Sequence, residues 1–389
     1  MSQVVLHNAI LLDPESGQSV PGGLILDGER IDARLDSPER IGDDGLQIDL
    51  GGRYLAPGFI DIHYHGRFAF NGFDAADDAA RVAVEQAASL VRHGTTAYLA
   101  TTVAQAHDVL SAQVEALAHS LSDPPSGGAR GIGVHLEGPW INRDAAGAQP
   151  LAGIRACRIG EVRDLLERAG GWLRMVTLAP EVDGVPELLR LLGERGIVAA
   201  MGHSRANSDQ IDAAIERGAC HVTHLFNAMA PFHHRAPGLV GAALGDPRLS
   251  ADLICDGVHV DPRAVQLAAR ALAERLLLIT DRVDPPRPSG ELSPEKGELY
   301  DDGGAVRLAD GRLAGSSLTL DAAVHNAIAF ANLSLLDAVS ACTLRPARLL
   351  GIEREYGTLR PGARADLVVL DAEGGVLETW LSGRRVHPA

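Results

Sequence analysis

The chain has 389 residues and a formal net charge of −16, with 46% hydrophobic and 22% charged residues. This apolar content suffices for a large core and excludes a disordered chain, while the acidic balance argues against partners such as nucleic acid or an anionic membrane surface. No basic leader and no apolar run of eighteen residues is found, so we expect a cytoplasmic protein that does not enter a membrane.

Residues 1–54 predict short β-strands separated by turns, with apolar stretches at 4–13, 22–28 and 46–58. Glycine, proline and aspartate separate these stretches, as is typical of strand–turn–strand segments. The C-terminal residues repeat the pattern at 357–371 and 375–386. Neither end has enough apolar surface to fold alone. We therefore expect residues 1–54 and 352–389 to form one small β-sandwich domain together.

Between these ends, residues 55–351 alternate strand-like apolar runs with amphipathic helical segments. The eight runs are FIDIH, TAYLAT, IGVHLE, MVTLAPE, GIVAAMGH, HVTHLFN, ADLICDGVH and LLLITD. Helices are expected at 79–94, 159–170, 186–196 and 208–218, each ending in a glycine suited to the left-handed position after a helix. Eight such units over roughly 250 residues predict a TIM-like (β/α)8 barrel. The sixth unit is the weakest, and a loop with a short helix is expected there.

Polar side chains end these apolar runs. They are His63, His65, Glu137, His203, His224, His259 and Asp281. In a barrel of this class the active groups lie at the carboxyl ends of the strands, because the loops that follow the strands build the site there. We therefore expect these side chains to meet at one mouth of the barrel.

A metal site is the simplest reason for this residue set. His63 and His65 are two positions apart and point to the same face of their strand, although two hydrogen-bonded histidines would explain the pair equally well. Glu137, His203 and His224 supply the three ligands of a catalytic zinc site that leaves a position for water. We expect a divalent metal there, in the first place zinc, with iron, manganese or cobalt as alternatives. A second ion at His63 and His65 stays open.

Asp281 follows the last apolar run, where it is suited either to cap the next segment or to act as a general base beside a metal-bound water. The sequence contains one lysine, Lys296, in a polar stretch. Some binuclear hydrolases on this barrel bridge two metals with a carboxylated lysine from a strand end. Lys296 is not placed for that role, so Glu137 is the candidate for any bridge.

These motifs in this order resemble the amidohydrolase superfamily, and specifically the N-acetylglucosamine-6-phosphate deacetylases. The matching stretches are PGFIDIHYHG, HLEGPW, GHSRA, THLFNAM, HHRAPGLVG, DGVHVDP, LITD, LAGSSLTL and ACTLRPARLLG, from about residue 55 to residue 351. The resemblance implies a homodimeric, metal-dependent enzyme that deacetylates an amino-sugar phosphate. It assigns the principal metal to Glu137, His203 and His224, a possible second ion to His63 and His65, and acid–base catalysis to Asp281.

The resemblance also implies the substrate contacts. Asn227, Ala228 and Arg235 would receive the sugar phosphate, His259 would contact the sugar or the acetamide, and Leu313 would line the substrate loop. Taken from the residues alone, Asn227 suits a turn, Arg235 an exposed ion pair and His259 a structural hydrogen bond.

The chain departs from the family pattern at two positions near the site. Gln149 stands where the family usually has a histidine that reaches the substrate, and Arg282 follows Asp281 where a small residue is usual. These changes leave the metal chemistry intact, and they leave open both the exact sugar and whether the substrate carries a phosphate. The alternatives are N-acetylgalactosamine 6-phosphate or another N-acylated substrate, a cyclic-amide hydrolase, and a barrel protein without catalytic activity.

Overall fold

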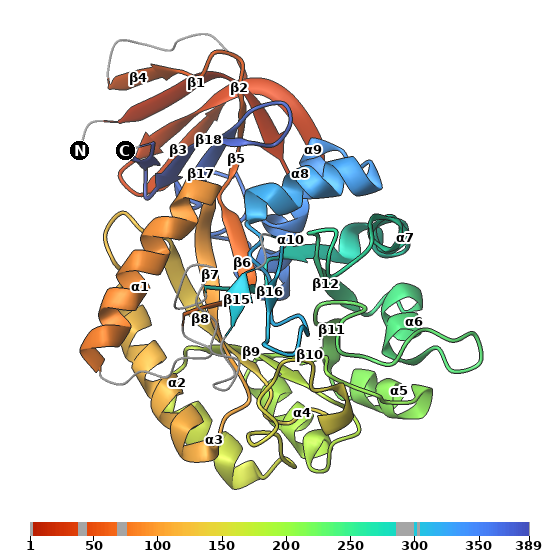
Figure 1. Cartoon of the computed structure of the whole chain (residues 1–389). Helices are drawn as coiled ribbons and strands as arrows, with labels where there is room; N and C mark the ends of the chain where they lie inside the picture. Colours follow the sequence, from red (N-terminus) through yellow and green to blue (C-terminus); the bar gives the residue numbers. More distant parts are fainter. Residues whose placement is uncertain (1–2, 38–44, 68–75, 285–298, 302–303, 389) are drawn as a thin grey trace.

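The structure of the chain is a computed structural model, which describes residues 3–37, 45–67, 76–284, 299–301 and 304–388. Figure 1 shows a ring of strands surrounded by helices, and above it a second sheet in which the first and the last strands of the chain lie together. The predicted fold class is confirmed: a TIM-like barrel carries a small β unit made from both ends of the chain.

The small unit is a mixed sheet with the strand order β19-β18-β17-β5-β1-β2-β3, in which β4 also pairs with β1. The strand β5 joins the two ends, because it pairs in parallel with β1 and antiparallel with β17. The small unit has a hydrophobic core of its own, which includes Leu6, Leu24, Leu55, Leu367 and Trp380. The strands are β1 Val4–Asp13, β2 Gln18–Asp27, β3 Arg30–Leu35, β4 Leu46–Asp49, β5 Tyr54–Pro57, β17 Leu367–Leu370, β18 Val376–Leu381 and β19 Arg384–His387.

The barrel is a nine-stranded sheet in which each strand from β6 to β13 pairs with the next, and each predicted run contributes one of these strands. The short strand β14 follows β13 and pairs in parallel with β6, which closes the ring. The strands are β6 Phe59–Gly66, β7 Thr95–Thr102, β8 Arg130–Glu137, β9 Leu173–Leu178, β10 Val198–Met201, β11 Ala219–Val222, β12 Ser250–Ile254, β13 Leu276–Ile279 and β14 Arg282–Val283.

Helices connect the strands and cover the outside of the ring (Figure 1). They are α1 Ala76–Leu90, α2 His107–Ser122, α3 Ile159–Arg168, α4 Val185–Glu194, α5 Ser208–Glu216, α6 Gly238–Gly245, α7 Pro262–Leu272, α8 Leu320–Ala331, α9 Leu335–Ala341 and α10 Leu344–Leu349. Short 3-10 turns lie at Val91–His93, Arg143–Ala145 and Ala273–Arg275, and a small hairpin pairs β15 Tyr300–Asp301 with β16 Val306–Arg307.

The predicted helices form, and glycine residues explain where several of them end. Gly94, Gly196 and Gly218 follow their helices with φ angles of 75°, 64° and 102°, values that favour glycine. The sixth unit contains only the short helix α6, as expected. Within the described ranges, no helix is both long and apolar enough to cross a bilayer.

Candidate active site

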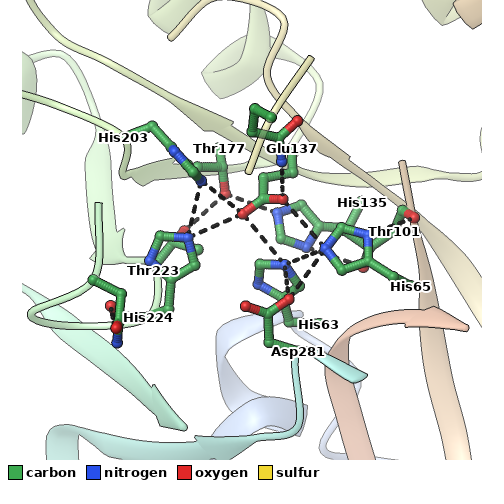
Figure 2. A network of polar contacts seen from close by, with 12 residues as sticks. His63, His65, Thr101, His135, Glu137, Thr177, His203, Thr223, His224 and Asp281 are labelled. Atoms are coloured by element: carbon green, nitrogen blue, oxygen red, sulfur yellow. Dashed lines mark hydrogen bonds and ion pairs between the residues drawn. The ribbon is translucent and has the colours of Figure 1, made fainter. Parts of the chain in front are cut away.

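The polar residues that end the barrel strands come together in one buried cluster at the carboxyl ends of the strands. Figure 2 shows Glu137 in its middle, with two histidines on one side and two histidines and an aspartate on the other. The first group is His203 and His224, and the second is His63, His65 and Asp281. These residues come from β6, β8 and the segments that follow β10, β11 and β13.

Glu137 and the first pair of histidines have the spacing of a metal site. The Oε1 atom of Glu137 lies 3.0 Å from Nε2 of His203 and 3.0 Å from Nε2 of His224, and the two nitrogens are 3.1 Å apart. All three side chains are buried. Ligand atoms around a tetrahedral ion with bonds of roughly 2.0–2.1 Å lie about 3.3 Å apart. The three atoms therefore need only small adjustments to bind one ion.

The second group lies beside the same carboxylate. The Nε2 atoms of His63 and His65 are 3.2 Å apart, and Oδ1 of Asp281 lies 3.5 Å and 3.2 Å from them. Glu137 faces both imidazoles, with Oε1 3.4 Å from His63 Nε2 and Oε2 3.2 Å from His65 Nε2. Glu137 therefore completes a three-residue set with His203 and His224 and also contacts the second set, which consists of His63, His65 and Asp281.

The electrostatics of the cluster favour a cation. Burial lowers the pKa of His65, but the ion pairs with Asp281 and Glu137 outweigh it and raise the pKa to about 10. Burial also opposes protonation of His224, yet Glu137 raises its pKa to about 9. The Nδ1 atoms of His63 and His224 are buried without a hydrogen-bond partner. The Nε2 atoms of the same rings point into the cluster, where they contact Nε2 of His65 and Nε2 of His203. A nitrogen–oxygen donor set with this preference for positive charge fits a divalent metal.

Three of these residues have backbone conformations that aim their side chains at the cluster. His203, His224 and Asp281 have φ angles of 47°, 35° and 50°, which residues other than glycine seldom adopt. Neighbouring segments hold them: Asp281 donates its N–H to the carbonyl of His63 at 2.9 Å and accepts from Ser316 N–H at 2.8 Å. The scaffold thus stabilises conformations that are unfavourable in isolation.

His135 lies beneath the cluster and received no role from the sequence. Burial and the neighbouring His63 hold its pKa well below the usual value, so the ring is neutral. Its Nδ1 lies 3.1 Å from the carbonyl of Ile62, which can only accept, so Nε2 accepts from the Thr177 hydroxyl at 2.8 Å. The His135 ring packs edge-on against His63, with centroids 4.7 Å apart. Its position two residues before Glu137 on β8 was the available signal.

A cavity of about 270 Å³ opens above the cluster. Ten residues singled out from the sequence line it: His65, Glu137, Gln149, His203, His224, Asn227, Ala228, His259, Asp281 and Leu313. His259 donates through Nδ1 to Asp256 Oδ2 at 2.6 Å, which leaves Nε2 for a ligand. Arg235 is not among the lining residues. It lies on an exposed turn, where its guanidinium contacts the ring of His234 at 2.9 Å.

The two departures from the family pattern have different consequences. The Oε1 atom of Gln149 accepts from the backbone N–H of Ala104 at 2.7 Å, so its Nε2 must be the atom that donates to Glu137. Gln149 therefore contacts the central carboxylate and keeps one N–H for the cavity. Arg282 does not line the cavity, because its guanidinium pairs with Asp284 at 2.8 Å. Lys296 lies outside the described residues.

Arg312 also lines the cavity, although no motif in the sequence distinguishes it from other arginines. Its Nη1 donates to the carbonyl of Gly147 at 2.6 Å and its Nε pairs with Asp310 at 2.8 Å. The contact with Gly147 joins two loops of the rim. Among the described residues that line the cavity, Arg312 is the one arginine or lysine.

The fold and this cluster define a (β/α)8-barrel protein with a candidate metal centre at the carboxyl ends of its strands. A family model described as "Amidohydrolase family" matches residues 54–386, which is most of the chain. The chain therefore belongs to the amidohydrolase family.

Individual proteins and solved structures are also similar to this chain over most of its length. N-acetylglucosamine-6-phosphate deacetylase from Bos taurus is 37% identical over 377 residues, which cover 94% of this chain and 90% of the relative. N-acetylgalactosamine-6-phosphate deacetylase from Escherichia coli O157:H7 is 37% identical, with 85% and 87% covered. A solved structure of a Mycobacterium smegmatis N-acetyl-D-glucosamine-6-phosphate deacetylase mutant, in complex with N-acetyl-D-glucosamine-6-phosphate, has a TM-score of 0.87 at 33% identity. It covers 99% of this chain and 100% of its own.

The cluster predicts which histidines bind metal. Replacing His203 or His224 by alanine removes one of three ligands, so we expect zinc affinity to fall by more than about 100-fold, at or beyond the upper end of outer-shell effects. Elemental analysis and competition with a chromophoric chelator measure the loss. His119→Ala, at an exposed position of α2, is the matched control and should bind zinc like the wild type. Equal zinc affinity in all of these proteins, with unchanged circular dichroism, would rule out the first ligand group.

Proposed function

We propose that this chain is a metal-dependent deacetylase of an N-acetyl amino-sugar phosphate. The preferred substrate is N-acetylglucosamine 6-phosphate, and the products are glucosamine 6-phosphate and acetate. The observation that carries the proposal is the meeting of Glu137, His203, His224 and Asp281 at the floor of one cavity. The relatives from Bos taurus and Mycobacterium smegmatis, which match most of the chain, are named as N-acetylglucosamine-6-phosphate deacetylases.

We propose zinc as the metal, held by Glu137, His203 and His224, with iron, manganese or cobalt as alternatives. His63 and His65 would hold a second ion beside Asp281, and Glu137 would then be the bridging carboxylate. A divalent ion there supplies Lewis acidity to the amide carbonyl and lowers the pKa of water from 15.7 to about 7.

Asp281 is the residue suited to move the proton. Burial raises the pKa of this carboxyl, but the imidazoles of His63 and His65 outweigh burial and hold the pKa below its usual value. Asp281 is therefore ionised at neutral pH and can accept a proton from the attacking water. It then delivers this proton to the nitrogen of the departing amine, because an amine leaves far more readily once protonated.

The walls of the cavity supply candidate substrate contacts. The free Nε2 of His259 would bind the acetamide or a sugar hydroxyl, and Gln149 would offer its remaining N–H. Leu313 would pack on the sugar, and Asn227 and Ala228 would bind the polar end of the substrate. Because Arg235 is exposed, we propose that it reaches a phosphate only in a homodimer. A phosphorylated sugar does not cross a membrane unaided, which supports a cytoplasmic location.

The alternative substrate is N-acetylgalactosamine 6-phosphate, which differs in one hydroxyl. The named relative from Escherichia coli O157:H7 supports it, since its identity to this chain is also 37%. Acetate release from both epimers, each with and without the phosphate, tests the two candidates.

For the domain division we propose residues 1–54 with 352–389 as the small domain and 55–351 as the catalytic barrel. Two hydrophobic clusters support this division, since one consists mostly of barrel residues, together with Leu12, Val368 and Leu370, and the other mostly of residues from the two ends of the chain. The strand β5 extends the small sheet as far as Pro57.

The role of Asp281 predicts a separation between metal binding and turnover. We expect Asp281→Asn, which keeps the shape but cannot accept the proton, to retain zinc and to lower kcat by about 10²- to 10⁴-fold. Acetate release and elemental analysis measure the two effects. Asp209→Asn, at an exposed position of α5, is the control and should match the wild type. Full activity in Asp281→Asn would refute the assigned role.

A phosphate site predicts that an arginine substitution affects only phosphorylated substrates. Losing one charge-assisted hydrogen bond costs about 1.5–3 kcal/mol, so Arg235→Gln should lower kcat/KM for the sugar phosphate by about 10- to 100-fold. The unphosphorylated sugar should be hydrolysed as before. Arg312→Gln, measured in the same way, tests whether the arginine on the cavity rim contributes, and Arg263→Gln on α7 is the control. An unchanged ratio of the two substrates in both variants would exclude phosphate recognition by these arginines.

A further inference from the structure

A second polar array is buried between β11 and β12, away from the lining of the cavity. His221 and Asp252 are both 0% exposed, and Nε2 of His221 lies 2.9 Å from Oδ2 of Asp252. The other ring nitrogen, Nδ1, lies 2.7 Å from the hydroxyl of Ser250, which also lies 3.3 Å from the carbonyl of Cys220. Such a buried polar array is retained only where its members satisfy one another.

Asp252 also holds the turn that follows β11. The backbone N–H of His224 donates to Oδ1 of Asp252, and the N–H of Leu225 donates to the Asp252 carbonyl at 2.9 Å. One residue therefore binds two successive N–H groups, one through its side chain and one through its backbone. His221 fixes the other carboxylate oxygen, so the Asp252 side chain cannot rotate away.

The turn from 224 to 228 requires such support. His224, Phe226 and Ala228 have φ angles of 35°, 79° and 51°, so three non-glycine residues in five adopt the left-handed region. Each costs about 1–3 kcal/mol and persists only when its surroundings define it. This turn carries the His224 imidazole, and Asn227 and Ala228 line the cavity.

We propose that Asp252, fixed by His221, is a positioning residue that sets the turn from 224 to 228. Through that turn it determines the affinity of the candidate metal site and the shape of the substrate-binding wall. It touches neither the cavity nor the other five residues of the cluster. The part of the inference that concerns substrate rests on the proposed function, and the part that concerns metal affinity does not.

The hydrogen-bond pattern specifies a conservative and a disruptive substitution. In Asp252→Asn the Oδ1 atom still accepts from the N–H of His224, and the new amide faces Nε2 of His221. That nitrogen can accept if Nδ1 carries the ring proton and donates to Ser250, whose hydroxyl donates to Cys220. Asp252→Leu keeps the branch point at Cγ but is larger and has no acceptor, so the N–H of His224 is left unpaired.

The test is a zinc titration of the full chain against a chromophoric chelator, followed by kcat and KM for acetate release at saturating zinc. We expect Asp252→Leu to lower zinc affinity by about 10- to 100-fold, as losses outside the ligand shell do, and to raise KM more than it lowers kcat. Asp252→Asn should stay within about threefold of the wild type on the same scale. Ser250→Ala, at the far end of the array, should change zinc affinity least.

A purely structural role gives a different result. In that case Asp252→Leu lowers the melting temperature while zinc affinity and KM stay at wild-type values, and the proposal is overturned. Should Asp252→Leu fail to fold, Asp252→Ser decides the question, since its hydroxyl is too short to replace Oδ1 opposite the His224 N–H. A wild type that releases no acetate would defeat the proposed function, while the zinc titration would still decide the positioning role.

Discussion

The structure of the site depends on one buried carboxylate. Glu137 is 2% exposed at the end of β8, where an uncompensated charge would cost several kcal/mol. Five groups compensate it, namely the imidazoles of His63, His65, His203 and His224 and the amide of Gln149. Burial raises the pKa of Glu137, but the surrounding histidines outweigh burial and hold the pKa well below its usual value. Glu137 therefore stays ionised at the centre of the cluster, where it can bind a cation.

Two kinds of structure bring these groups to Glu137. Parallel strands deliver residues from distant parts of the sequence to one edge, and on β6 the two-residue period directs His63 and His65 to the same face. The strands β10, β11 and β13 end two residues before His203, His224 and Asp281. Each of these three residues has a positive φ angle, and this backbone conformation directs its side chain toward Glu137. Such turns are stabilised by hydrogen bonds from neighbouring segments. Residues that do not contact a ligand themselves, such as Asp252, therefore determine the geometry of the site.

The sequence predicts the features that follow from short-range periodicity. Apolar runs mark the strands β6 to β13, and polar residues at the ends of six of these runs mark the carboxyl edge of the barrel, so the sequence predicts that these residues meet. The two-residue strand β14 has no such run and was not predicted. The remaining features depend on register and loop paths. His221 meets Asp252 across 31 residues because β11 and β12 pair, and Arg312 reaches Gly147 across 165 residues because two loops fold over one rim. Neither contact leaves a local pattern.

The charges also constrain how an anionic ligand can lie in the cavity. The whole chain is acidic, and two carboxylates, Glu137 and Asp281, form the floor. Imidazoles with a raised pKa, those of His65 and His224, lie beside these carboxylates, so the floor holds positive as well as negative groups and is poorly solvated. The guanidinium of Arg312 lies at the solvent-exposed rim of the cavity. Its side chain is 60% exposed, while the side chain of Glu137 is 3% exposed. Under the proposed function, the phosphate would lie toward the guanidinium of Arg312 at the rim, and the acetamide would lie toward the histidines of the floor.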